Sequence, residues 1–346
     1  MTQCTLLLVG CGNVGAGIAA AFVRSGRWSV TIVDPCADLV PPEHTLLPCS
    51  IDELSDEQLA EQLAMCDEIV YAAECGNRDE YAARPEMARE NCERFERFAR
   101  RVASLGSGAA TRHIAYVGGS WTRREARVCE GRLLVGDDTP AKADAEANAY
   151  ERAKTAALAT AQALAASERL QITFVDWISV VPNLAPNFTV AKMVAAALDT
   201  GVVRFSAGDF GRPLLSGTNA GHALLLLTEK RRLESAAAPV PGCSSVLMPG
   251  HFTTFHRFAE IVQEAVTAST QAPPGGVTLE PVEDGTPAAL AARCESEQLA
   301  TTVGFVPDAA AVDEGLRETA RAALHTLPRR KEGGGPGTRT SVPPVQ

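Results

Sequence analysis

Several features are missing from this 346-residue chain, and each absence narrows what it can do. Basic residues are not in excess: the formal net charge of −10 argues against nucleic acid or an anionic membrane as the main partner. No apolar run is long enough to cross a bilayer, and no signal peptide is expected because a strand-like apolar pattern begins at Cys4. No internal repeat is visible. We therefore expect a globular, cytoplasmic protein that binds a small-molecule substrate, with no nucleic-acid or membrane partner.

The ten cysteines form no metal-binding or disulfide pattern. The chain has no C-x-x-C pair and no Cys/His block at zinc spacing. His251 and His256 flank an aromatic-rich turn, but they lack the i,i+4 spacing and an obvious acid partner. The sequence thus predicts reduced thiols and no metal site.

What is present is a glycine-rich segment close to the N-terminus. The apolar residues 6–9 break into Gly10-Cys11-Gly12-Asn13-Val14-Gly15, and helix-forming residues follow. The first glycine permits a tight strand-to-helix turn, the second lets a pyrophosphate approach the backbone, and the third lets the helix pack closely on the strand. The helix N-terminus offers free N–H groups to the phosphates. The alternative is an ordinary glycine-rich turn, and the strand and helix around the motif favour a dinucleotide site instead.

An acid at the end of the next apolar run supports this interpretation. Asp34 follows the glycines by about twenty residues, the spacing of a dinucleotide fingerprint. Its carboxylate can accept hydrogen bonds from both ribose hydroxyls and would repel a 2′-phosphate. The predicted cofactor is therefore NAD rather than NADP.

Strands and helices alternate through the first half of the chain. Strand patterns at residues 4–9, 29–33, 68–73, 113–117 and 172–178 alternate with helix patterns at 14–25, 55–65, 84–105 and 141–167. This alternation predicts an α/β fold, a Rossmann-type doubly wound parallel sheet with helices on both faces.

After Pro182, prolines interrupt shorter elements. Helices are expected at 190–198, 219–232, 255–266, 287–300 and 313–324, and strands at 202–205 and 245–248. We expect an NAD-binding Rossmann domain over residues 1–181 and a smaller mixed substrate-binding domain over 182–326, with some segments returning to the first domain. Residues 327–346 have the composition of a disordered tail.

A tyrosine and a lysine share one face of the helix expected at 141–167. Tyr150 and Lys154 are four residues apart. A phenol titrates near pH 10, and a neighbouring ammonium lowers that pKa, so the tyrosine can exchange a proton with a hydroxyl or carbonyl. A surface Tyr and Lys on a charged helix is the alternative.

Two further polar residues accompany this pair. Ser120 follows an apolar strand, where the ligand crevice of an open parallel sheet lies; the alternative is a serine that caps the next segment. Asn91 lies inside a predicted helix, although Asn is a poor helix former. It either faces solvent without a role or stabilises a kink and binds a water.

Taken in order, these residues resemble the extended short-chain dehydrogenase/reductases, also named the NAD-dependent epimerase/dehydratase family. The resemblance runs from Cys4 to about Leu324 and rests on the glycine loop, Asp34, Ala72-Ala73, Asn91, Ser120 and Tyr150-x-x-x-Lys154. It implies that Tyr150 is the general acid/base, that Lys154 tunes it and binds ribose, that Ser120 orients the substrate, and that Asn91 supports the active-site helix or a proton relay. It implies cofactor contacts from Gly10, Gly12, Asn13, Val14, Gly15, Asp34, Ala72, Ala73, Tyr150 and Lys154, and a homodimer built from the two long helices.

The chain also departs from the family pattern. Val9 occupies the first glycine position of the family's loop. Trp121 and Thr122 stand where the family's sugar dehydratases carry Asp-Glu, which argues against 4,6-dehydration. Asp176-Trp177 replaces Arg-Pro after a later strand. These changes leave the expected redox centre intact and weaken the case for the usual nucleotide-sugar substrate.

The sequence therefore predicts an NAD-dependent oxidoreductase that transfers hydride at a secondary alcohol or ketone of a polar metabolite, with a sugar nucleotide or modified sugar as the leading substrate. Substrate contacts are assigned to Ser120, Trp121, Thr122 and Arg212, with a solvated arginine as the alternative for Arg212. An NAD-retaining sugar epimerase would use the same residues. A non-catalytic NAD sensor or scaffold on the same fold is the rival from another class.

Overall fold

The structure is a computed structural model. It describes residues 3–36, 40, 44–74, 76, 78–105, 112–118, 127–129, 132–135, 149–168, 170–177, 179–182, 188–208, 210–234, 241–282, 293–294, 299 and 303–326.

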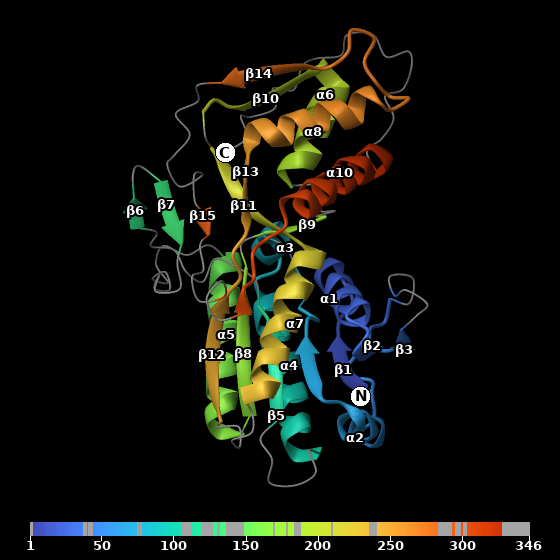
Figure 1. Ribbon diagram of the computed structural model, residues 1–346, viewed down its shortest axis with the longest axis vertical. Helices are drawn as coiled ribbons and strands as arrows, with labels where there is room; N and C mark the ends of the chain where they lie inside the picture. The colour runs from blue at the N-terminus through green and yellow to red at the C-terminus, as the bar shows by residue number, and fades with distance from the viewer. Residues whose placement is uncertain are drawn as a thin grey trace.

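A seven-stranded sheet forms the base of the molecule (Figure 1). Its strands lie in the order β12-β8-β5-β4-β1-β2-β3, and every neighbouring pair is parallel. They are β1 (Cys4–Val9), β2 (Trp28–Val33), β3 (Thr45–Leu47), β4 (Glu68–Tyr71), β5 (Arg112–Val117), β8 (Leu170–Asp176) and β12 (Gly242–Leu247). The direction in which the chain adds strands reverses between β1 and β4. In sheets of this kind the ligand crevice lies at that switch point, beyond the carboxyl ends of the strands.

Helices cover both faces of this sheet, as the alternating pattern predicts. Leu6 and Leu8 of β1 point to one face, with α1 (Asn13–Arg24) and α7 (Gly217–Glu234). Leu7 and Val9 point to the other, with α2 (Asp56–Met65), α4 (Glu86–Leu105) and α5 (Ala149–Ser167). Strands β1, β2 and β4 are buried on both faces over most of their length, which explains why their sequences are largely apolar runs. The doubly wound α/β fold is confirmed.

Helices α1 and α7 cross at glycines. A Cβ added at Gly17 would lie 2.2 Å from the backbone of Gly217, and one added at Gly221 would lie 2.4 Å from the carbonyl oxygen of Gly17. The two backbones touch directly, so no side chain larger than hydrogen fits between them.

Replacing Gly221 with alanine is therefore expected to lower the free energy of unfolding by about 1–3 kcal/mol, measured by urea denaturation. Alanine is the better helix former by about 1 kcal/mol, but the backbone carbonyl of Gly17 has no room to move away. Gly242→Ala is the matched control, because a Cβ there would meet no atom within 4 Å. Equal stability of the Gly221 variant and the wild type would contradict this account of the crossing.

A second group of elements stands over the carboxyl ends of the strands (Figure 1). It contains α6 (Thr189–Thr200), α8 (Phe255–Thr267), α10 (Ala309–Thr326), β9 (Val180–Val181), β10 (Val202–Ser206), β11 (Gly211–Ser216), β13 (His251–Thr254) and β14 (Thr278–Val282). The three helices share one apolar core with residues such as Val203, Leu214 and Phe258. Strand β11 pairs with β13 and β9, and β10 pairs with β14.

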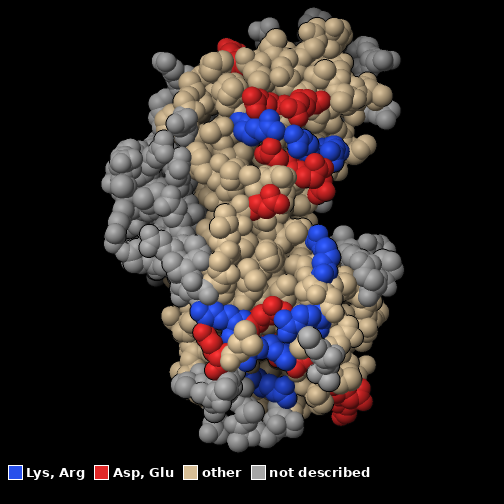
Figure 2. Space-filling view, in the orientation of Figure 1, with Lys and Arg blue, Asp and Glu red and all other residues tan. Residues whose placement is uncertain are grey.

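Charges of both signs are mixed on the face seen in Figure 2, with no basic stripe there. On α8, Arg257 lies 2.8 Å from a carboxylate oxygen of Asp313 and 2.9 Å from one of Glu260. Such pairs explain the mixed pattern over α8 and α10 and contribute little individually to stability.

Several local predictions are confirmed. β1 spans the residues predicted for it, and α2 begins after Ser55, whose hydroxyl accepts from the Gln58 N–H in a capping box. Thr254 caps α8, with its hydroxyl accepting from the Arg257 N–H. The helix predicted over 84–105 is α4, which begins two residues later, at Glu86, and a separate short helix that was not predicted, α3 (Arg78–Ala83), precedes it.

The helix predicted over 287–300 is wrong at Arg293–Cys294. These residues form strand β15, which pairs with β7 (Arg132–Val135), and β7 in turn pairs with β6 (Arg127–Cys129). Residues 141–148 of the predicted helix and the tail at 327–346 lie outside the described residues.

The described residues also bear on two other points. Among them, no helix is both long enough and apolar enough to cross a bilayer. Nor do three or more His, Cys, Asp or Glu side chains gather there in a group able to hold a metal ion.

Candidate active site

The glycine-rich loop makes the tight turn expected of it. Gly10 has a φ of +95°, a conformation that favours glycine. A Cβ at this position would lie 2.7 Å from the backbone of Ala72 and Ala73, just after β4. The loop after β1 and the loop after β4 are therefore in contact at the carboxyl ends of these two strands, where ligands of parallel sheets bind.

The other two glycines differ from each other. A Cβ at Gly15 would lie 2.2 Å from the carbonyl oxygen of Gly10, so the close contact is between helix and loop rather than helix and strand. A Cβ at Gly12 would meet nothing within 4 Å. Gly12 is also the N-cap of α1 and offers no side-chain acceptor to the first N–H groups of that helix. The space and the donors suit a phosphate group.

Asp34 ties this loop to the end of β2. Its Oδ2 accepts from the Cys11 N–H at 2.6 Å, and its Oδ1 accepts from the Cys36 N–H at 2.7 Å. Each oxygen keeps capacity for a further hydrogen bond, such as one from a ribose hydroxyl. The neighbouring Asn13 donates from Nδ2 to the carbonyl oxygen of Pro182 at 2.9 Å, so its side chain holds the segment after β9.

Tyr150 and Lys154 lie on one face of α5, as their spacing predicts. The Lys154 Nζ is 5.0 Å from the centre of the Tyr150 ring. The same nitrogen lies 2.6 Å from Oε1 of Glu74, and both side chains of this ion pair are 7% exposed. Because Glu74 directly follows Ala72 and Ala73, the ion pair connects the Tyr/Lys pair to the segment that contacts the glycine loop.

Glu74 is the centre of a buried polar network. The Tyr81 hydroxyl donates to its Oε1 at 2.8 Å, and the Tyr116 hydroxyl donates to its Oε2 at 3.1 Å. Asn91, which is buried on α4, donates from Nδ2 to the Tyr81 oxygen at 2.8 Å. Asn91 therefore faces this network rather than solvent.

All four tyrosines of the chain gather around this network. The rings of Tyr81 and Tyr150 meet edge to face with their centres 5.6 Å apart, and Tyr71 stacks on Tyr116 at 5.5 Å. Aromatic pairs of this kind fix ring positions. The Tyr81 ring of α3 thus holds the Tyr150 ring in place.

The electrostatics of Tyr150 differ from the prediction. Burial raises the pKa of the Tyr150 phenol, Lys154 lowers it, and the carboxylates of Glu74 and Asp176 raise it again. The net direction is upward, because the lysine is one positive charge among two acids in a site that excludes water. Burial opposes the charge of Lys154 as well, but Glu74, Tyr150 and Asp176 outweigh it and raise the pKa of Lys154.

The remaining predicted residues fall in different places. Ser120, Trp121 and Thr122 lie outside the described residues, so their approach to Tyr150 stays a prediction. Arg212 lies on β11, in the second group of elements, with its guanidinium carbon 5.9 Å from the centre of the Phe255 ring. Trp177 is buried in the core of the sheet.

Sequence reasoning missed Glu74, Tyr81 and Asp176. Glu74 is the clearest case, because it follows Ala72-Ala73 at the carboxyl end of a strand, where ligands of parallel sheets bind. An acidic residue directly after this strand was the one signal in the sequence that could have identified Glu74 as part of the site. Asp176, at the carboxyl end of β8, is placed in the same way and receives a hydrogen bond from Ser245 at 3.3 Å.

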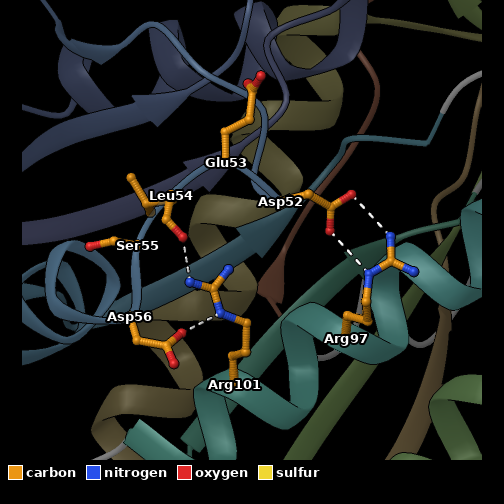
Figure 3. Close-up of a pocket in the computed structure, with 7 residues that line it drawn as sticks. All are labelled: Asp52, Glu53, Leu54, Ser55, Asp56, Arg97 and Arg101. Carbon is orange, nitrogen blue, oxygen red and sulfur yellow. Dashed lines mark hydrogen bonds and ion pairs between the residues drawn. The ribbon is translucent and has the colours of Figure 1, made fainter.

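An open hollow of about 560 Å³ lies elsewhere, between the start of α2 and α4 (Figure 3). Arg97 forms a two-point contact with Asp52, and Arg101 contacts Asp56 at 2.7 Å. Each arginine of this hollow is thus paired with an acid of the same hollow. These ion pairs connect α4 to the segment at the start of α2, and we assign no ligand to the hollow.

The chain was compared with known proteins. No protein-family model and no curated protein matches its sequence. Its structure aligns over 93% of the chain with 98% of the UDP-Glc/GlcNAc 4-epimerase from Campylobacter jejuni, at a TM-score of 0.69 and 12% identity. The chain has the fold of nucleotide-sugar epimerases.

Other solved structures agree. A UDP-glucose 4-epimerase from Brucella ovis, in complex with NAD, aligns over 92% of this chain and 99% of its own, at a TM-score of 0.67 and 14% identity. The dTDP-glucose 4,6-dehydratase DesIV from Streptomyces venezuelae, with NAD bound, aligns over 93% of this chain and 97% of its own, at a TM-score of 0.64 and 16% identity. The fold implied by the resemblance to extended short-chain dehydrogenase/reductases is thereby confirmed, while identities this low carry no activity across.

Proposed function

We propose that this protein is an NAD-dependent oxidoreductase of the extended short-chain dehydrogenase/reductase type, with Tyr150 as its general acid/base. The observation that carries the proposal is the position of the Tyr150–Lys154 pair. It is joined through Glu74 to the segment that packs against the glycine loop. This connection supports a proton-transfer role for Tyr150 close to the candidate phosphate site.

The residues present fit NAD. The pyrophosphate would lie over Gly12 and the start of α1, where a Cβ would meet open space. Asp34 would accept from the ribose hydroxyls, and Lys154 is the candidate for the nicotinamide ribose. Similar structures in complex with NAD, among them the Brucella ovis epimerase, add support. Bound NAD would supply the acceptor for a hydride leaving the substrate carbon.

Tyr150 would take the proton of the substrate hydroxyl as the carbon loses hydride, leaving a carbonyl group. In the reverse direction it would return that proton to the carbonyl oxygen. Ser120 is proposed to hold the same oxygen, and Arg212 to bind an anionic part of the substrate. Trp121 and Thr122 are proposed as further substrate contacts. Lys154 keeps a positive charge next to the phenol in both directions.

The substrate class we propose is a sugar nucleotide or other modified sugar. A sugar epimerase that retains NAD is the second candidate, favoured by the epimerases among the similar structures. It would use the same side chains for oxidation followed by reduction from the other side. We also propose a homodimer through α4 and α5 and a cytoplasmic location.

The test combines cofactor analysis with a substrate panel. The purified protein is denatured and its released nucleotide identified, and the intact protein is then incubated with NAD and a panel of nucleotide sugars, free sugars and other secondary alcohols. We expect NAD binding with either growth of NADH absorbance or a changed sugar without net NADH. The first result identifies a dehydrogenase and the second an epimerase. Absence of any NAD binding would overturn the proposal.

A further inference from the structure

Glu74 is the acid closest to the charged nitrogen of the candidate site. Its Oε1 lies 2.6 Å from the Lys154 Nζ, and its two oxygens also receive the Tyr81 and Tyr116 hydroxyls. These donors come from α3, β5 and α5, so three elements fix one carboxylate. A group held this firmly has little freedom to turn away from Lys154.

The lysine is in turn held between the acid and the phenol. It lies 5.0 Å from the centre of the Tyr150 ring and 5.9 Å from that of Tyr81. An ammonium that is only 7% exposed needs a countercharge, and Glu74 provides it. Where Lys154 sits, and how much of its positive charge Tyr150 feels, therefore depend on Glu74.

We propose that Glu74 is a positioning residue for the Tyr150–Lys154 pair: its carboxylate, held by Tyr81 and Tyr116, fixes the ammonium beside the Tyr150 ring. The inference rests on the proposed function of Tyr150 as acid/base and adds a residue to it. Glu74 acts on the phenol in two ways, by holding Lys154 in place and by its own negative charge, and it is assigned no contact with the substrate.

Every ionisable group that faces the pair enters the balance. Lys154 favours the phenolate, whereas Glu74 after β4 and Asp176 on β8 oppose it. Tyr81 on α3 and Tyr116 on β5 stay protonated, because burial and Glu74 raise the pKa of both. Cys92 on α4 stays a thiol, since burial raises its pKa too. Glu74 is in direct contact with Lys154, at 2.6 Å.

The consequence is a bias in the direction of proton transfer. A phenol that holds its proton is a proton donor first, which suits reduction of a carbonyl. Removing the charge of Glu74 makes the site more positive, so the first proton leaves the coupled pair at lower pH. Of the two partners, the phenol is the one expected to release it.

Glu74→Gln tests this without substrate or cofactor, by following tyrosinate absorbance in the near ultraviolet as pH is raised. We expect the first tyrosinate transition about one pH unit lower in Glu74→Gln than in the wild type. Glu74→Asp keeps the charge but draws it back by one methylene, so its transition should fall between the two. Tyr150→Phe in each background should remove this transition and so identify its source.

Glu90→Gln is the matched control, since it removes the same charge from an exposed ion pair on α4 and should leave the titration unchanged. Circular dichroism limits the comparison to the pH range in which each variant is folded. If Glu74→Gln is folded and its first tyrosinate transition falls at the same pH as that of the wild type, the inference is overturned. If that variant does not fold, a folded Glu74→Asp that titrates with the wild type has the same meaning. A shift in a protein that shows no turnover would leave the inference standing and count only against the proposed function.

Discussion

Tyr150→Phe is expected to lower turnover by about 10²–10⁴-fold while NAD affinity and stability remain close to the wild type. Phenylalanine keeps the ring that meets Tyr81 edge to face at 5.6 Å and removes only the hydroxyl. The measurement is kcat on the best substrate of the panel, with NAD titrated separately by calorimetry.

Tyr81→Phe is the control for this experiment. It also removes one phenol oxygen from the site, but that oxygen bonds Glu74 and Asn91 and is assigned no proton transfer. Its effect on kcat should be far smaller than that of Tyr150→Phe. Equal losses in the two variants would show that the network, rather than the Tyr150 proton, matters for turnover.

Gly12→Val should weaken NAD binding by about 100-fold, with only a small decrease in the thermal unfolding temperature because valine is a poorer N-cap of α1 than glycine. The backbone of Gly12, at a φ of −67° and a ψ of −168°, is extended and available to valine, and a Cβ there meets no protein atom within 4 Å. The side chain would occupy the space assigned to the pyrophosphate. Loss of two charge-assisted hydrogen bonds, worth about 3 kcal/mol together, corresponds to that factor.

Gly15→Ala provides the contrast. Its Cβ would lie 2.2 Å from the Gly10 carbonyl oxygen, so this smaller substitution is expected to destabilise the fold itself. Unchanged NAD affinity in a folded Gly12→Val protein would contradict the assignment of this loop to the cofactor.

Much of the fold could be predicted because its determinants are local. The apolar run of β1, the Ser55 cap of α2 and the positive φ of Gly10 each depend on a few adjacent residues. The shared face of Tyr150 and Lys154 follows from helix geometry alone. Short strands such as β3 and β9 were missed, because a strand of two or three residues is defined by its distant partner rather than by its own sequence.

The site was less predictable for the same reason. Glu74 and Lys154 are 80 residues apart in the chain, and neither local pattern indicates the other. The predicted direction of the Tyr150 pKa shift was wrong, because the sequence spacing indicated only one neighbouring charge, that of Lys154. Burial and the acids of β8 and the segment after β4 belong to the tertiary structure. Charge balance in a buried site depends on which elements meet there.

The chain path has a consequence for how the protein can be divided. Strand β12 is an edge of the seven-stranded sheet, and α7 rests on the glycines of α1, yet both come after β9 in the sequence. A fragment that stops after β9 would leave the outer side of β8 without its hydrogen-bonding neighbour and one surface of α1 bare. The part of the sheet that carries the glycine-rich loop is thus completed only by residues later in the chain, so the two parts of the chain on either side of β9 are not separate units.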